Sequence, residues 1–347
     1  MEFLYEYGLF LAKAITFVVA VIAIVAVVAG EAMKQKGKKG HLEIDDLSEH
    51  FEDVEQEIVH ALLSKDELKE KEKADKKAEK EKAKAAKKQK DDDKPQEKPR
   101  LFVLDFNGSI DAKEVAGLRE EVSAVLSVAT PADEVFIRLE SGGGMVHGYG
   151  LASSQLDRIR QKEIPLTIAV DKVAASGGYM MACVANKIIA APFSILGSIG
   201  VLAQVPNFNK LLKKNDIEFE QLTAGEYKRT LTMFGENTDK GREKFVEELE
   251  ETHQLFKDFV GERRPSLDMD KVATGEHWFG TKALELGLVD KIQTSDDYLY
   301  EAAKTRKVIA LKFETKKGLA EKLSKAASLS FDSILGKLMQ RNRVFPE

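Results

Sequence analysis

The stretch Asp171-Lys-Val-Ala-Ala-Ser-Gly-Gly-Tyr-Met-Met-Ala-Cys-Val-Ala-Asn186 places a serine where two sequence patterns meet. Before it, the run Pro165–Val170 is short, apolar and partly β-branched, which is typical of a buried strand. After Ser176, small and flexible apolar residues recur at the spacing of a helix. The sequence therefore predicts a strand, a turn that contains Ser176, and a helix.

Ser176 in this turn has two interpretations. Backbone N–H groups at the start of a helix are unpaired and favour negative charge, so such a turn suits the nucleophile and oxyanion donors of an acyl-transfer enzyme. Serine is also a common helix cap with no catalytic role. The stretch by itself supports both interpretations equally, and the rest of the chain has to separate them.

Strand and helix patterns alternate around this stretch. Strands are expected at 101–106, 134–140 and 165–170, and helices at 113–128 and 146–161. Such alternation produces βαβ units and a parallel sheet, hence an α/β fold. Because the crossovers are right-handed, loops at the carboxyl ends of the strands lie side by side. The loop Ser141–Gly144 and the Ser176 turn should therefore face one cleft.

The second half of the chain continues the folded domain. A further strand is expected at Ile217–Leu222, a long charged helix at Asp239–Arg263, and a helix followed by a short strand within 281–290. The apolar content of 179–205 resembles a membrane span, but the break at Pro192 favours a buried core.

The N-terminal residues 1–30 are predicted to form a membrane anchor. Tyr7–Ala29 carries one charge, Lys13, and is long enough to cross a bilayer. Glu2 and Glu6 stand where a cleaved signal peptide has basic residues, so we expect the anchor to be retained. Several lysines follow the span, and the positive-inside rule then places the rest of the chain in the cytoplasm.

Residues 31–100 are expected to combine an amphipathic helix with a charged spacer. Apolar residues three and four apart, from Ile44 to Ile58, indicate a helix that packs against either a second copy or the folded domain of the same chain. Residues 65–100 consist almost wholly of Lys, Glu, Asp, Ala and Gln and cannot bury a core. The interleaved acids argue against nucleic-acid binding there.

The C-terminal part, residues 311–347, is expected to carry another amphipathic helix. Leu319–Met339 has an apolar face and basic residues on its polar face. Such a helix lies on a membrane surface or docks onto another subunit.

The composition excludes some kinds of site. The charge is unevenly placed along the 347 residues, so the net value of -5 says little about partners. The single cysteine, Cys183, excludes an intrachain disulfide and is expected to fill the core. No pairing of Cys and His at metal-ligand spacing occurs in the sequence. We therefore expect no zinc site and no cofactor.

A nucleophilic serine needs a neighbouring base, which is usually histidine. His147 follows the glycine loop, but its position is more typical of a solvent-facing residue in the first turn of a helix. A lysine acts as a base only when it is neutral, so burial must lower its pKa from about 10.4. Lys228 follows a predicted strand and a glycine turn, but chemistry alone does not select it among the many exposed lysines.

Five motifs occur in an order and at spacings that resemble a known family. They are Glu140–Gly144, Ala175–Tyr179, Gly197–Val201, Gly225–Arg229 and Gly280–Asp290. Together they resemble the signal peptide peptidase A family of serine peptidases, of the S49 type, over roughly residues 100 to 295. The anchor, the charged spacer and the single half-sized catalytic domain are most similar to one branch of that family.

The resemblance implies a ClpP/crotonase-like α/β fold and a Ser–Lys dyad. Ser176 matches the family's nucleophile and Lys228 its general base. Ser198 matches the serine whose hydroxyl orients that lysine. The peptidase domain would comprise residues 101–310.

The resemblance also implies the oxyanion donors. One would be the amide of Gly177, and the other an amide of the glycine loop, from Gly143 or Gly144. The family usually has proline after Ser141, whereas this chain has Gly142 there. This departure loosens the loop and leaves the choice of loop donor open.

By the same resemblance, the substrates would be apolar, membrane-derived peptides such as signal-peptide remnants. A ring-shaped homo-oligomer is implied too, in which the lysine can reach the serine of an adjacent subunit. Members of this kind are anchored in the bacterial inner membrane and typically face the periplasm. That location conflicts with the cytoplasmic one that the charge rule favours.

Two other functions stay open from the sequence. A crotonase-type acyl-thioester enzyme would use the paired loops to hold a thioester oxyanion, and it predicts a catalytic Glu or Asp at the cleft. It gives no reason for a Gly-x-x-Lys turn or a membrane anchor. A non-enzymatic membrane scaffold would use the anchor, the charged stalk and an oligomerising domain.

Overall fold

The structure, a computed structural model, describes residues 40–64 and 98–315 throughout, with single residues between 7 and 17 and between 66 and 77. The chain divides into two compact units: residues 43–312 form one, and both ends of the chain form the other. The predicted anchor and spacer lie mostly outside the described residues, and the predicted helix Leu319–Met339 lies wholly outside them. Among the described residues, no helix is both long and apolar enough to cross a membrane.

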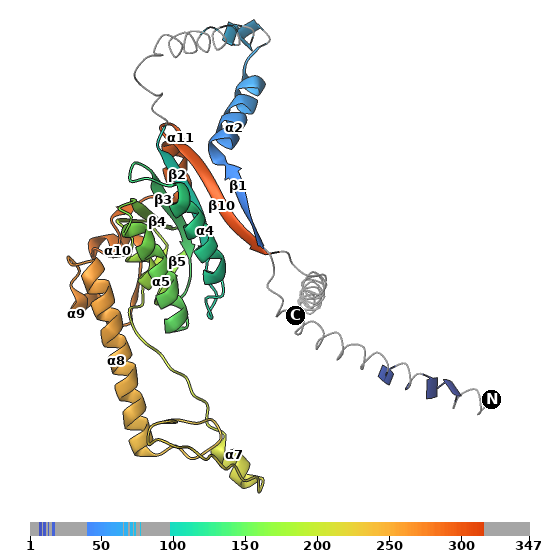
Figure 1. The fold of residues 1–347 in the computed structure, drawn as a ribbon, viewed down its shortest axis with the longest axis vertical. Coiled ribbons are helices and arrows are strands. Elements are labelled where there is room, and N and C mark those ends of the chain that lie inside the picture. The colour runs from blue at the N-terminus through green and yellow to red at the C-terminus, as the bar shows by residue number, and fades with distance from the viewer. Residues whose placement is uncertain are drawn as a thin grey trace, which may run out of the picture. The chain divides into compact units, whose positions relative to one another are not determined.

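A seven-stranded sheet forms the centre of the fold, in the order β1-β10-β2-β3-β4-β6-β9. Figure 1 labels its first five strands, with β10 between β1 and β2. Its strands are β1 (Gly40–Asp46), β2 (Arg100–Asn107), β3 (Glu134–Glu140), β4 (Leu166–Val170), β6 (Lys187–Ala190), β9 (Lys291–Ile292) and β10 (Lys307–Thr315). From β10 to β9, neighbouring strands run parallel. The predicted α/β fold with a parallel sheet is confirmed.

Helices cover both faces of this sheet. On one face, three helices pack side by side: α4 (Val115–Val128), α5 (Val146–Arg160) and α6 (Gly177–Ala182). The other face is covered by α11 (Ser295–Ala303) and α2 (Leu47–Leu62). Side chains of β2 alternate between the two faces of the sheet, as in any strand. Leu101 and Val103 pack in the cluster with α11, whereas Phe106 contacts Tyr149 of α5 on the other face.

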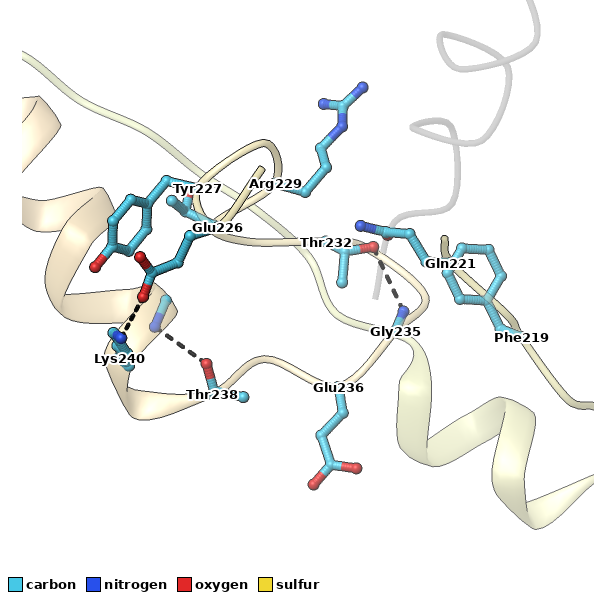
Figure 2. A pocket seen from close by; sticks show the side chains of 12 residues that line it. Phe219, Gln221, Glu226, Tyr227, Arg229, Thr232, Gly235, Glu236, Thr238 and Lys240 are labelled. Atoms are coloured by element: carbon cyan, nitrogen blue, oxygen red, sulfur yellow. Dashed lines mark hydrogen bonds and ion pairs between the residues drawn. The ribbon is translucent and has the colours of Figure 1, made fainter. Parts of the chain in front are cut away.

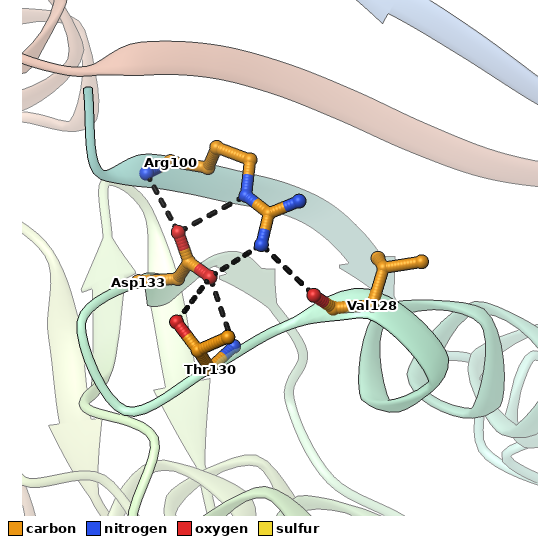
Figure 3. A network of polar contacts seen from close by, with 4 residues as sticks. All are labelled: Arg100, Val128, Thr130 and Asp133. Carbon is orange, nitrogen blue, oxygen red and sulfur yellow. Dashed lines mark hydrogen bonds and ion pairs between the residues drawn. The ribbon is translucent and has the colours of Figure 1, made fainter. Parts of the chain in front are cut away.

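A buried carboxylate holds the start of β2. Asp133 accepts hydrogen bonds from the backbone N–H of Arg100 at 2.8 Å and from its guanidinium at 3.1 and 2.7 Å (Figure 3). Thr130 donates to the same carboxylate through its N–H and its hydroxyl, and the guanidinium also reaches the carbonyl of Val128 in α4. Burial by itself would raise the pKa of Asp133, but these hydrogen bonds lower it well below its ordinary value.

A second, smaller sheet positions two serines. Its order is β5-β7-β8, with β5 (Val173–Ala175), β7 (Ile195–Gly197) and β8 (His277–Phe279). β5 and β7 run parallel with Ala175 opposite Gly197. Ser176 follows directly after the first of these strands and Ser198 directly after the second. Their parallel register therefore brings the two serines to the same level.

The prediction that the apolar segment 179–205 forms buried core is confirmed for 179–190, except for Asn186 and Lys187, whereas Leu202 and Val205 are exposed. All six residues of α6 are buried, and the segment is divided by β6 and β7. The predicted long helix is confirmed as α8 (Asp239–Arg263). After it, α9 (Met269–Val272) and α10 (Gly280–Glu285) lead to β9.

Residues 202–238, which we call the arm, join β7 to α8 and contain one helix, α7 (Asn209–Lys214). The strand predicted at Ile217–Leu222 is wrong, because this segment has no regular structure and Leu222 is 86% exposed. Alternating apolar residues form a half-buried strand when a neighbouring strand takes up their backbone hydrogen bonds. In the described part of the chain, no strand pairs with this segment.

The predicted amphipathic helix is confirmed in part. Ile44 lies in β1 rather than in the helix, and α2 begins at Leu47 because the carboxylate of Asp46 caps its first turn. Leu47 and Phe51 pack against the core, while Ile58 stays exposed. Two of the five residues of the predicted apolar seam therefore pack against the core of the sheet.

Candidate active site

Ser176 occupies a sharp turn between β5 and α6. Its backbone has φ 51° and ψ -120°, which residues other than glycine rarely adopt, and its N–H donates to the carbonyl of Gly197 at 2.8 Å. Its side chain makes no capping hydrogen bond to α6, so the hydroxyl does not have the capping role that the sequence allowed. Such backbone strain costs about 1–3 kcal/mol and collects at functional sites. A strained strand-to-helix turn is also how some hydrolases expose a nucleophilic serine.

Ser198 has a similarly unusual backbone. Its φ is 50°, and it follows Gly197, whose φ is 94°. The N–H of Ser198 donates to the carbonyl of Glu276 at 2.6 Å, which fastens the turn to the segment before β8. Ser176 and Ser198 line the same cavity.

The glycine loop Ser141–Gly144 packs directly against the Ser176 turn. Two backbone hydrogen bonds of Ser141, at 2.8 and 3.0 Å, join the loop to β5. A Cβ placed on Gly143 would lie 2.6 Å from the nitrogen of Gly177 and 2.8 Å from the Cβ of Ser176. Gly143 also has a φ of 87°, so glycine is required there for both space and conformation. The prediction that the loop and the turn share one cleft is confirmed.

A cavity of about 930 Å³ lies at the two serines. It is lined by the glycine loop, the Ser176 turn, the segment 200–202 after Ser198 and one side of α8. Large apolar side chains dominate the lining, among them Ile110, Met145, Met180, Leu255 and Phe259. Among the described residues that line it, none has an ionisable side chain. The cavity therefore suits an apolar ligand. It does not provide the Glu or Asp that a crotonase-type thioester enzyme would need.

Lys228 lies in an exposed turn of the arm and is not among the residues that line this cavity. The residues beside it anchor this turn to the start of α8, around a hollow of about 370 Å³ (Figure 2). Glu226 forms an ion pair with Lys240. The ring of Tyr227 lies beneath the ammonium groups of Lys240 and Lys244, at 5.8 and 5.7 Å. The single chain thus brings Ser176 and Ser198 together, but not Lys228.

Histidines play little part in this cavity. His147 is exposed, as predicted. His253 of α8 bonds through Nε2 to the carbonyl of Ile199 at 3.1 Å and so fastens α8 to the residue after Ser198. No histidine lines the cavity within the described part of the chain.

Sequence reasoning missed Tyr149. This residue of α5 is fully buried, and its hydroxyl lies 2.5 Å from the hydroxyl of Ser141 at the base of the glycine loop. Helical periodicity identifies Tyr149 as an inward-facing residue of α5, but it does not tell which loop passes above it.

Two sequence models of one peptidase family match the chain. "Peptidase family S49 N-terminal" matches residues 2–156, and "Peptidase family S49" matches residues 158–309. The chain is 51% identical over 337 residues to the "Probable protease SohB" of Haemophilus influenzae, which covers 96% of each protein. It is 53% identical over 302 residues to the protein of the same name from Buchnera aphidicola subsp. Schlechtendalia chinensis, covering 86% of this chain and 99% of that one. A "Putative protease" of Methanocaldococcus jannaschii is 32% identical over 167 residues, 48% of this chain and 53% of that protein.

Proposed function

The chain belongs to peptidase family S49, and from this premise we propose that it is a membrane-anchored serine endopeptidase with a Ser–Lys dyad. Ser176 is the nucleophile, Lys228 is the general base, and Ser198 orients the lysine. The amide of Gly177 and one amide of the glycine loop form the oxyanion hole. The peptidase domain, residues 101–310, has a ClpP/crotonase-like fold.

One observation carries this proposal. Ser176 has a strained backbone, lies beside Ser198 and opens into an apolar cavity lined by no ionisable side chain among the described residues. A strained, uncapped serine in such a cavity has the placement of a nucleophile. A base that enters from elsewhere would be desolvated there, which lowers the pKa of a lysine toward the neutral form that catalysis needs.

Lys228 is the base in this proposal, and a neighbouring copy supplies it. In the single chain the lysine is exposed on the arm. The arm also exposes large apolar side chains, among them Leu211, Ile217, Phe219 and Leu222. Exposed apolar surface of this kind marks a contact with another protein. A ring-shaped homo-oligomer would cover it and bring each Lys228 to the Ser176 of the next subunit.

The reaction is an acyl transfer. Neutral Lys228 takes the proton of the Ser176 hydroxyl as its oxygen attacks the peptide carbonyl. The backbone amides donate hydrogen bonds to the oxyanion. In other enzymes, removing one such donor raises the activation free energy by about 2.7–4 kcal/mol. The protonated lysine then gives its proton to the leaving amine, and the neutral lysine activates water that releases the acyl group from Ser176.

The apolar cavity supports apolar substrates, such as signal-peptide remnants derived from the membrane. An extended peptide would lie beside the glycine loop as an added strand and use main-chain hydrogen bonds. Residues 1–30 would hold the enzyme in the bacterial inner membrane by one span, and residues 31–100 would serve as a spacer. Following the family resemblance, we place the catalytic domain in the periplasm, against the charge rule. A reporter fused to the C-terminus tests that location.

A serine-reactive fluorophosphonate and an apolar fluorogenic peptide test the dyad. Ser176→Ala and Lys228→Ala should each lose both labelling and cleavage, with the mass of the assembly unchanged. Lys228→Arg is the matched control, because arginine keeps the charge but stays protonated and cannot act as a base. Cleavage that persists in Lys228→Ala would remove the dyad, and cleavage that persists in Ser176→Ala would remove the nucleophile.

Mixed assemblies test where the base comes from. When Ser176→Ala and Lys228→Ala chains are assembled together, some interfaces pair an intact Ser176 with an intact Lys228 from its neighbour. Activity should then return in part, although each variant alone is inactive. If the mixture stays inactive while its mass matches the wild type, each chain completes its own dyad.

A further inference from the structure

Beneath the glycine loop lies a buried pair of hydroxyl groups that the proposed reaction does not use. Tyr149 is 0% exposed and Ser141 is 2% exposed, and their oxygens are 2.5 Å apart. The hydroxyl of Tyr149 also donates to the carbonyl of Ser109 at 2.9 Å. On the other side, the N–H of Gly143 donates to the Ser141 oxygen at 3.1 Å.

Each hydrogen bond in this chain of groups has a definite direction. A carbonyl can only accept, so the single hydroxyl hydrogen of Tyr149 points to Ser109. The Ser141 hydroxyl must then donate to the Tyr149 oxygen, and its own oxygen is left to accept from the N–H of Gly143. Burial raises the pKa of Tyr149, which keeps this donor protonated at neutral pH. The order of donation therefore runs from Gly143 through Ser141 and Tyr149 to Ser109.

This order decides which amide of the glycine loop is available to a substrate. The N–H of Gly143 is turned inward and committed to Ser141. The N–H of Gly144 donates to no other described residue, and Gly144 lines the cavity with Ser176 and Gly177. Gly144 is therefore the loop residue whose amide is left for a developing oxyanion.

Tyr149 also supports the other side of the oxyanion hole. A Cβ placed on Gly177 would lie 2.4 Å from the ring of Tyr149, so the backbone of Gly177 rests against that ring. One buried side chain thus contacts the Ser176 turn through its ring and the glycine loop through its hydroxyl. Its hydroxyl restrains a loop in which Gly142, unlike a proline, leaves the backbone free.

We propose that Tyr149 and Ser141 are positioning residues that set the oxyanion hole, by holding the Gly143 amide inward so that Gly144 and Gly177 become the two donors. This inference rests on the proposed peptidase function and deepens it. Neither side chain touches the substrate. Both act through the orientation of backbone amides, so their removal should weaken binding of the transition state more than binding of the substrate.

Tyr149→Phe in the full-length protein tests the inference, because it keeps the ring against Gly177 and removes the hydroxyl. We expect kcat for an apolar peptide to fall roughly 10- to 100-fold, as for small misplacements of reacting groups, with KM nearly unchanged. A peptide boronic acid forms a tetrahedral anionic adduct with a nucleophilic serine. Its affinity should fall in parallel with kcat/KM.

Tyr179→Phe is the matched control. Tyr179 is also 0% exposed, and its hydroxyl also donates to a backbone carbonyl at 2.9 Å, that of Leu288. Both variants should lower the melting temperature, but Tyr179→Phe should leave kcat and the boronic acid affinity unchanged. The second test variant is Ser141→Ala, which removes the acceptor of the Gly143 N–H. Combined with Tyr149→Phe, it should cost little more than either change alone, because both break one chain of hydrogen bonds.

Equal effects of Tyr149→Phe and Tyr179→Phe on kcat and on boronic acid affinity would overturn the inference and leave Tyr149 a purely structural residue. Additive losses in the double variant would overturn it as well. Failure of the proposed function has a different signature, since Ser176→Ala would then still cleave the peptide and the wild type would not bind the boronic acid covalently.

Discussion

The start of β2 and the turn of the arm that carries Lys228 are both held by a carboxylate and a cation, yet the two regions differ in what surrounds them. At the start of β2, Asp133 has a side chain that is 4% exposed and accepts five hydrogen bonds from Arg100 and Thr130. In the arm, the side chains of Glu226 and Lys240 are 62% and 68% exposed. The first pair has a buried carboxylate and a partly exposed guanidinium, whereas both members of the second pair lie in solvent.

The difference indicates how each region is stabilised. The sheet and its helices bury their own apolar side chains, so the single chain completes this region by itself. The arm leaves Leu222 at 86% exposed and buries none of its residues, so the contacts that it makes within the single chain leave its apolar side chains in solvent. A peptidase with its serine in the first region and its base in the second would be active only after assembly.

The largest effect on stability is expected for Asp133→Asn. Hydrogen bonds to a charged group contribute about 1.5–3 kcal/mol, and this change replaces the carboxylate that accepts from Arg100 and Thr130 by a neutral amide. We expect the free energy of unfolding, measured in urea, to fall by about 2–3 kcal/mol. The control is Asp105→Asn, which breaks an exposed pair with Arg138 in the neighbouring strand and should cost less than about 1 kcal/mol. Equal losses would mean that burial does not distinguish the two pairs.

Leu222→Ser tests the covering of the arm. In a single chain the change should leave the free energy of unfolding unchanged, because the side chain is already exposed. If a second copy covers it, the lost burial of about 1.5–3 kcal/mol weakens self-association roughly 10-fold or more, with a matching loss of peptidase activity at low protein concentration. Sedimentation velocity measures the association. Val128→Ser is the control, because Val128 is exposed at the end of α4 and outside the arm. This variant should self-associate as strongly as the wild type.

The pH dependence of stability sharpens the contrast at Asp133. Its pKa is lower in the folded chain than the ordinary value near 3.9, so its contribution is present above about pH 4 and is lost as pH falls further toward the folded-state pKa. The stability difference between wild type and Asp133→Asn should therefore be constant from pH 7 to about pH 5 and shrink below about pH 4. A difference that stays the same at pH 3 would contradict the role assigned to the carboxylate.

The smallest effect is expected for Glu226→Gln. The pair with Lys240 is exposed, so salt screens it, and the free energy of unfolding should not change measurably. The pair anchors the turn that carries Lys228, and its loss should lower kcat slightly. Added salt should lower the wild-type kcat by a similar amount and leave the variant unaffected. A large loss of kcat in Glu226→Gln would show that the pair is covered in the active assembly.

Much of the fold follows from local pattern. The strand at Glu134–Glu140 and the helix at Asp239–Arg263 have the predicted bounds, because a buried strand and an amphipathic helix have different periods of apolar residues. The same reasoning fails at Ile217–Leu222. Apolar and polar side chains alternate there as in a strand, but a strand also needs a neighbouring strand to take up its backbone hydrogen bonds. The described part of the chain offers no such neighbour.

For the site, the sequence by itself determined that Ser176 follows a buried strand and that a glycine loop ends another, because the patterns of both elements are local. It also predicted membership of the family, which the 51% identity to a relative over 96% of the chain confirms. The tertiary structure alone decided that Ser198 lies level with Ser176, since this depends on the parallel register of β5 and β7. It likewise decided that Tyr149 lies under the glycine loop, because contacts between distant segments depend on how helices pack over the sheet and not on the period of any one of them.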